Sequence, residues 1–192
     1  MSESARVFVA ILFPSDVRTA IARQTAELRG GDPALKPVRE EQIHLTLRFL
    51  GDTPRARLDE VAARLCEVAA EIEPFELDVE GAGAFPGARR PVVLWAGVRE
   101  SDALETLHET VEETLVSLGL GRDDRPFHPH VTVARVRRGG GTPPHLREAL
   151  AGAVVRAAVR VASIALVESV LGPGGARHEV LERCRLGSRR PS

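Results

Sequence analysis

A short pattern, His-x-Thr followed by an apolar residue, occurs twice in the sequence. The first copy is His44-Leu-Thr-Leu47 and the second is His130-Val-Thr-Val133. Side chains at positions i and i+2 of a β-strand point to the same face of the sheet. Each copy would therefore set an imidazole and a hydroxyl side by side, with the intervening apolar residues facing a core. Two such strands facing each other would place two histidines and two threonines around one cleft.

A single His-x-Thr on a strand is weak evidence for a site, because most such histidines are surface residues or hydrogen-bonded core residues. Two copies are harder to explain in that way. Each has an arginine nearby, Arg48 after the first and Arg135 after the second. The repeated motif therefore favours a catalytic cleft over two unrelated surface histidines.

The charge balance argues against a protein that coats nucleic acid through bulk charge. The 192 residues carry a formal net charge of -1, with an isoelectric point of about 6.6. Lys36 is the only lysine, so almost all of the positive charge comes from arginine. The planar guanidinium of arginine binds phosphate oxygens in a bidentate way, which the ammonium of lysine cannot do. A GC-rich genome would also favour arginine, together with Ala, Gly, Pro and Val. Such a genome explains most of the arginines. The length suits one domain or two closely packed lobes.

The two cysteines, Cys66 and Cys184, lie far apart in the sequence and form no Cys-x-x-Cys pair. They are predicted to be reduced, structural residues of a cytosolic protein. No apolar run approaches the length of a transmembrane segment, and the start of the chain lacks the features of a signal peptide. A cytoplasmic protein with no membrane partner is expected.

Strands and helices alternate along the chain. Apolar or alternating runs predict strands over 6–13, 42–51, 75–79, 92–98, 159–170 and 178–186, besides the strand that carries His130. Helical spacing predicts helices from Ser15, after Thr53 as N-cap, and after Ser101 or Asp102. Glycine- and proline-rich segments at 81–91 and 139–144 predict loops. Several strands come in adjacent pairs, and no glycine-rich phosphate loop follows the first strand, so an antiparallel α+β fold is favoured over a doubly wound sheet.

Two histidines that titrate near neutral pH can perform acid–base chemistry without a metal. One takes a proton from water while the other gives a proton to a leaving alkoxide. Threonine hydroxyls can donate to phosphoryl oxygens, and arginine can neutralise the charge that builds on the phosphoryl group. This set of residues is suited to cleavage of a phosphodiester, especially a strained cyclic phosphate.

On these residues the chain resembles the two-histidine (2H) phosphoesterase superfamily, and within it the RNA 2',3'-cyclic phosphodiesterases, also called 2'-5' RNA ligases. The resemblance covers nearly the whole chain, including the opening strand from Arg6 and the segments 44–51, 90–97 and 125–135. It implies a single bilobal domain over 1–192, with two antiparallel-sheet lobes, helices outside and one His-x-Thr strand per lobe lining a central groove. It also implies metal-independent hydrolysis of RNA 2',3'-cyclic phosphate ends to a 2'-phosphate, without a cofactor, by a monomer.

The resemblance carries over to this sequence residue by residue. It implies His44 and His130 as the catalytic histidines. We assign His44 as proton donor to the departing O3' and His130 as proton acceptor from water, and the reverse assignment stays open because reversible 2'-5' ligation would use each histidine in both roles. Thr46, Thr132 and Arg135 would bind the phosphate. Phe49, five places beyond His44, would pack against the terminal base.

Other histidines and arginines allow more than one interpretation. His178 stands where this family often has a tyrosine, and a surface position is favoured over a groove contact. His128 is interpreted as a support for His130, and His108 as a solvated helix residue. Arg48 and Arg137 would either add positive potential to the groove or be ordinary solvated arginines.

Three alternatives remain open at this point. His44, His128 and His130 could supply a zinc site, although no carboxylate ligand is evident. The groove could instead bind phosphorylated RNA ends without catalysis, although pure binding needs no acid–base pair. A third alternative is another small cyclic phosphate as substrate.

Overall fold

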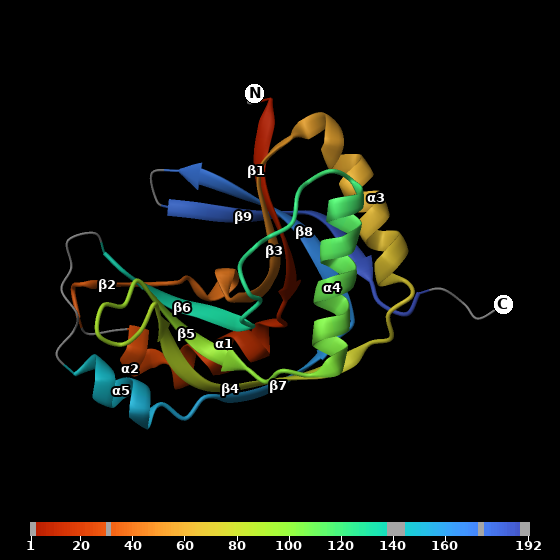
Figure 1. Cartoon of the computed structure of the whole chain (residues 1–192). Coiled ribbons are helices and arrows are strands. Elements are labelled where there is room, and N and C mark those ends of the chain that lie inside the picture. The colour runs from red at the N-terminus through yellow and green to blue at the C-terminus, as the bar shows by residue number, and fades with distance from the viewer. Residues whose placement is uncertain (1–2, 30–31, 138–144, 173–174, 189–192) are drawn as a thin grey trace.

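The computed structural model describes residues 3–29, 32–137, 145–172 and 175–188, and these residues build one curled antiparallel sheet (Figure 1). Its nine strands in the described chain follow the order β7-β4-β5-β6-β3-β1-β8-β9, with β2 paired to β6. The strands are β1 (Ser4–Leu12), β2 (Leu35–Pro37), β3 (His44–Pro54), β4 (Phe75–Phe85), β5 (Val93–Val98), β6 (His130–Val136), β7 (Arg156–Val161), β8 (Ser163–Gly172) and β9 (Gly175–Arg185).

The sheet has two halves that meet at the two motif strands. Strand β3 belongs to the half β3-β1-β8-β9, and β6 belongs to the half β7-β4-β5-β6. The halves are joined where Leu45 of β3 pairs with Val131 of β6. Both residues are fully buried, as expected for the apolar positions between each His and Thr. The predicted antiparallel α+β architecture, with one His-x-Thr strand in each half, is confirmed.

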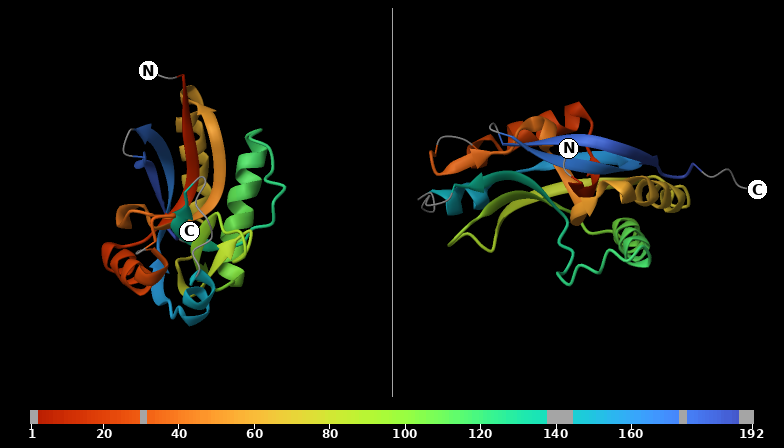
Figure 2. Two further views of the ribbon diagram at one scale, coloured as in Figure 1. Left: turned by 90° about the vertical axis from the view of Figure 1, so that its left-hand side faces the viewer. Right: turned by 90° about the horizontal axis from the view of Figure 1, so that it is seen from above.

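The helices cover the outside of this sheet. They are α1 (Ser15–Gln24), α2 (Ala26–Arg29), α3 (Leu58–Ala69), α4 (Asp102–Ser117) and α5 (Leu146–Gly152), with short 3-10 turns η1 (Glu40–Gln42) and η2 (Arg55–Arg57). Helix α3 packs against β9 and α4, and α1 packs against β7. Helices α1 and α4 lie on opposite sides of the molecule (Figure 2). Among the described helices, none combines the length and the apolar character needed to cross a membrane.

Some predicted boundaries were wrong. Thr53 is buried in β3 rather than capping a helix, and α3 begins only after η2, with no side-chain cap at Arg57. Residues 81–85, predicted as a loop, continue β4 because they pair with β5. The single strand expected over 159–170 is divided between β7 and β8. The predicted cap at Ser101 is confirmed, since its hydroxyl accepts from the amide of Leu104, whereas the segment 139–144 lies outside the described residues.

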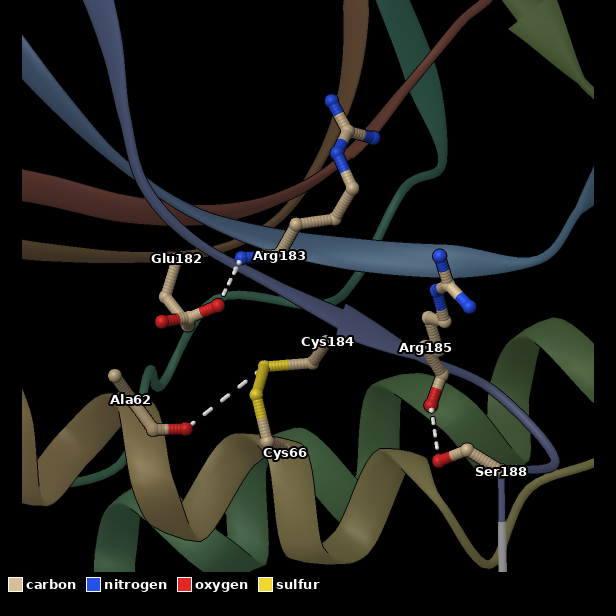
Figure 3. The surroundings of a disulfide bond; sticks show 7 residues. All are labelled: Ala62, Cys66, Glu182, Arg183, Cys184, Arg185 and Ser188. Atoms are coloured by element: carbon tan, nitrogen blue, oxygen red, sulfur yellow. Dashed lines mark hydrogen bonds between the residues drawn. A yellow bond between two sulfur atoms is a disulfide. The ribbon is translucent and has the colours of Figure 1, made fainter.

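The prediction that the two cysteines are reduced was also wrong. Cys66 of α3 and Cys184 of β9 form a disulfide, with their Cα atoms 4.5 Å apart (Figure 3). They are 118 positions apart in the sequence, so no local pattern indicates that α3 packs on β9. The bond joins the outer helix to the edge strand of the β3-β1-β8-β9 half.

Arg48 forms a buried ion pair that connects β3 to α4. Its Nε donates to Glu112 at 2.5 Å, and the exposed fractions of the two side chains are 9% and 5%. Another of its nitrogens donates to the carbonyl of Gly121 at 2.8 Å, and Glu112 also accepts from the amide of Asp123 at 2.8 Å. Arg48 is therefore a structural residue that faces away from the groove, and it holds the segment that leads toward His130.

This network predicts a large loss of stability when one partner is removed. Replacing Glu112 by Ala leaves a buried guanidinium without its counter-charge, which should lower the free energy of unfolding by about 3–5 kcal/mol. The double variant Arg48→Met/Glu112→Leu should cost much less than the two single changes together. Urea denaturation of the wild type, Glu112→Ala, the two single changes and the double variant measures this. A loss under about 1 kcal/mol for Glu112→Ala, the range of an exposed pair, would contradict it.

Candidate active site

The two motif strands carry the same irregularity at the same position. In β3, Leu47 is an extra residue between the pairs Arg48–Val9 and Thr46–Ala10. In β6, Val133 is an extra residue between the pairs Ala134–Leu94 and Thr132–Trp95. Such β-bulges shift the alternation of side chains by one position.

The bulges bring the fifth residue after each histidine to the groove. Strict alternation would turn Phe49 away from His44, and Arg135 away from His130, because an offset of five is odd. With one extra residue between each histidine and the fifth residue after it, both side chains share the face of their histidine. Phe49 and Arg135 line the groove together with His44 and His130. The predicted site residues are thus brought together in one place.

Each motif histidine is oriented by a backbone carbonyl two residues earlier in the chain. His44 Nδ1 lies 2.6 Å from the carbonyl oxygen of Gln42, and His130 Nδ1 lies 2.7 Å from that of His128. A carbonyl oxygen can only accept, so Nδ1 carries a proton in both rings. In the neutral rings Nε2 is then the basic nitrogen, and that of His44 lies 3.0 Å from the hydroxyl of Thr46.

The groove that holds these side chains has a volume of about 680 Å³. Strands from both halves contribute to it, because β3 and β6 lie at the junction. Its wall includes the histidine and threonine of both motifs, and also Arg125 and the apolar side chains of Phe8 and Leu171. Phe49 is half exposed, 50%, and its ring lies 5.9 Å from that of Phe8. One part of the groove is therefore cationic and polar, and another part is aromatic.

Burial and charge lower the pKa values of the groove histidines. Desolvation is the largest cause for His44, whose pKa falls to about 4, followed by the nearby His178, Arg135 and His130, although the bond to Gln42 opposes the shift. Desolvation and the charge of Arg135 also lower the pKa of His130 from its ordinary value. Both imidazoles are consequently neutral at pH 7 in the free protein.

The surface position favoured for His178 was wrong. Its ring lies edge-on to His44, with ring centroids 5.2 Å apart, and 5.0 Å from the ring of Phe8. Strand β9 brings it there because it pairs with β8, which pairs with β1 beside β3. Burial and the charge of Arg135 lower its pKa. His178 and Phe8 are the site residues that sequence reasoning missed, since neither belongs to a motif.

The support expected from His128 comes through its backbone carbonyl. Its ring lies 6.3 Å from that of Phe85, which also packs edge-on against His130. Within the described residues, no three His, Cys, Asp or Glu side chains gather in an arrangement that could hold a metal ion. His108, expected to be solvated, instead stacks on Phe127 with ring centroids 3.8 Å apart. Arg137 donates to the carbonyl of Pro33 at 3.0 Å.

Comparison with known proteins agrees with this architecture. The sequence profile of the 2'-5' RNA ligase superfamily matches residues 17–173. The chain is 30% identical to an RNA 2',3'-cyclic phosphodiesterase from Methanothermobacter thermautotrophicus, over 94% of this chain and 98% of that protein. It is 38% identical to a protein of the same name from Geobacillus stearothermophilus, over 69% of this chain but 42% of that longer protein.

A solved structure has the same fold. Escherichia coli LigT, crystallised with 3'-AMP, superimposes with a TM-score of 0.77 at 26% identity, covering 96% of this chain and 99% of LigT. The curled antiparallel sheet is therefore shared with LigT. Because the family profile spans most of the chain, this protein belongs to the 2'-5' RNA ligase superfamily.

The electrostatics of the groove predict how its histidines titrate. Since the charge of Arg135 lowers the pKa values of His44, His130 and His178, Arg135→Gln should raise all three. NMR titration of the imidazole protons should show His44 remaining neutral until the pH approaches about 4. Arg137→Gln, on the same strand segment, is the matched control and should leave the three values unchanged. A His44 that titrates at its ordinary pKa would show that its ring is solvated.

Proposed function

We propose that this protein hydrolyses RNA ends that carry a 2',3'-cyclic phosphate, and that it leaves a 2'-phosphate. The observation that carries the proposal is the pair of carbonyl-oriented histidines, one from each half of the sheet, facing one groove beside Arg135. The names of the relatives from Methanothermobacter and Geobacillus support the same substrate. One bilobal unit over 1–192, acting as a monomer, would be enough, because all of these residues come from one chain.

In the proposed reaction, His130 and His44 act on opposite sides of the phosphorus. Nε2 of His130 accepts a proton from water as its oxygen forms the new bond to phosphorus. The bond between phosphorus and O3' breaks, and Nε2 of His44 gives a proton to the departing O3'. The bond to O2' is kept, so the product is a 2'-phosphate.

Thr46, Thr132 and Arg135 would bind the phosphoryl oxygens during this exchange. Their donors stabilise the negative charge that develops on the phosphorane-like transition state. Since the two histidines and these donors supply acid, base and charge stabilisation, the proposed chemistry uses no cofactor. The same sequence of steps, with the 5'-hydroxyl of a second RNA replacing water, would produce a 2'-5' linkage.

The lowered pKa values have a consequence for the proton donor. His44 is neutral in the free protein at pH 7, so it must gain its proton when the anionic substrate binds. A phosphate anion within contact distance favours the imidazolium and raises the pKa. Once protonated, a histidine whose intrinsic pKa is low gives its proton to O3' more readily, which supports His44 as the donor.

A cytoplasmic location is the natural proposal for an enzyme that acts on RNA ends. The disulfide between Cys66 and Cys184 argues in the other direction, because thiols are kept reduced in most cytoplasms. The bond lies between α3 and β9, outside the groove, so the proposed chemistry does not depend on it.

The proposal is tested with a short RNA that ends in a 2',3'-cyclic phosphate, incubated in EDTA. The wild-type protein should form the 2'-phosphate, and His44→Ala and His130→Ala should each lower kcat by about 10²–10⁴-fold, because each removes one proton-transfer group. His145→Ala, at the start of α5, is the matched control. Turnover only after a divalent metal is added would support the zinc alternative, and tight binding without turnover would support a binding module.

Phe49 should contribute to binding of the terminal base rather than to the chemical step. Stacking of a base on an aromatic ring is worth about 1–3 kcal/mol, so Phe49→Ala should raise KM by about tenfold while kcat changes little. Val154→Ala, which shortens an even more exposed apolar side chain in the segment before β7, is the control. Steady-state kinetics on the same cyclic-phosphate RNA measures both constants, and a fall in kcat with unchanged KM would assign Phe49 a different role.

A further inference from the structure

A second cavity adjoins the groove on the far side of His44 and His178. It has a volume of about 500 Å³, and the two histidines line both spaces, so their rings form the shared wall. Beyond that wall the cavity is bounded by the end of β1, by α1, by the turn between β7 and β8 and by β9. A ligand that occupies the groove at His44 could therefore extend past this residue into a second space.

The charge of this cavity is positive. Three arginines, Arg18, Arg160 and Arg183, line it against one carboxylate, Glu41. The histidines add no compensating negative charge, and burial keeps both of them neutral at pH 7 because their pKa values are lowered. The cavity is thus suited to an anion.

Two of these arginines keep an uncompensated charge. Nη1 of Arg18 donates to the carbonyl of Phe13 at 2.9 Å, and Nη1 of Arg183 lies 3.3 Å from the hydroxyl of Ser163. Both partners are neutral, and among the described residues no carboxylate oxygen lies within 4.0 Å of either guanidinium. Arg160 differs, since it lies 3.4 Å from Glu76. Guanidinium groups with free N–H donors are the groups that best bind phosphate oxygens.

The position of Arg183 depends on another β-bulge. In β9, Leu181 is an extra residue between the pairs Val180–Val167 and Glu182–Leu166. Arg183 is five places beyond His178, and the bulge places both side chains on the face that lines this cavity. Phe49 and Arg135 are also five places beyond a histidine, and a β-bulge also brings each of them to the groove.

The cavity on the other side of the groove has the opposite character. It lies beside His130 and is lined by the aromatic rings of Phe85 and Trp95, with Glu80 and Glu100 against Arg99. Its carboxylates outnumber its one arginine, so it would repel a phosphate. An RNA strand that leaves the reaction centre should therefore pass His44 rather than His130.

We propose that the cavity of Arg18 and Arg183 binds the phosphate on the 5' side of the nucleotide that carries the cyclic phosphate. This inference rests on the proposed function, in which O3' and its ribose lie at His44. The 5' oxygen of that ribose then points away from the reacting phosphorus, toward the cavity. The site would make the enzyme prefer the end of an RNA chain over a nucleoside cyclic phosphate that lacks a 5' phosphate.

The test compares two small substrates that differ only at the 5' position. One is adenosine 2',3'-cyclic phosphate, and the other is the same molecule with a 5'-phosphate. A charge-assisted hydrogen bond is worth about 1.5–3 kcal/mol, so the wild-type kcat/KM should be about 10-fold to 100-fold higher for the 5'-phosphorylated substrate.

Variants of the two arginines test whether this cavity causes the preference for the 5'-phosphorylated substrate. Arg18→Gln and Arg183→Gln should each bring the ratio of kcat/KM between the two substrates toward one, and Arg183→Lys should retain most of it because the charge remains. Arg64→Gln, on the exposed face of α3, removes an arginine far from the cavity and should keep the wild-type ratio. Arg183 is exposed, so its variant remains informative if Arg18→Gln fails to fold.

The outcomes separate this inference from the proposed function. Equal kcat/KM for the two substrates in the wild-type protein would overturn the inference while leaving cyclic-phosphate hydrolysis established. A preference that persists in both glutamine variants would place the 5'-phosphate elsewhere and would also overturn it. Turnover of neither substrate, nor of a longer cyclic-phosphate RNA, would overturn the proposed function and this inference together.

Discussion

The site depends on one constraint, the pairing of two bulged strands at Leu45 and Val131. This pair is fully buried and lies where the halves of the sheet meet. It fixes the register between β3 and β6, and a slip of either strand by one residue would turn the histidine of that strand into the core. The bulges at Leu47 and Val133 then determine which later side chain reaches the groove. A small number of backbone irregularities therefore sets the composition of the site.

Two further sets of interactions hold the paired strands and their histidines in place. The buried pair of Arg48 and Glu112 holds β3 against α4 and against the loop after it. The carbonyls of Gln42 and His128 hold the motif imidazoles in one tautomer. Burial and the charge of Arg135 lower the pKa values of both rings. These interactions leave two oriented, neutral imidazoles beside an arginine, an arrangement that fits the proposed binding of a phosphate.

Membership of the 2'-5' RNA ligase superfamily agrees with this arrangement, and the positive cavity beyond His44 is the basis of the proposed selectivity. Small cyclic phosphates and RNA ends present the same reacting group, so the groove alone cannot distinguish them. A second phosphate contact outside the groove would distinguish them, because an RNA end has a 5' phosphate and a nucleoside cyclic phosphate lacks one. The cavity beside His130 is acidic and aromatic, so the two sides of the groove differ in charge.

The sequence by itself determined the antiparallel α+β class and the two motif strands, because strand periodicity and repeated spacing are local properties, whereas Phe49 and Arg135 were expected only from the family resemblance. Even so, the placement of Phe49 and Arg135 on the groove face contradicts strict alternation, and only the bulges, which depend on neighbouring strands, account for it. Tertiary structure alone decided that His178 and Phe8 join the site, that Arg48 is buried with Glu112, and that Cys66 meets Cys184. Each of these contacts joins segments distant in the sequence, so no local pattern could indicate it.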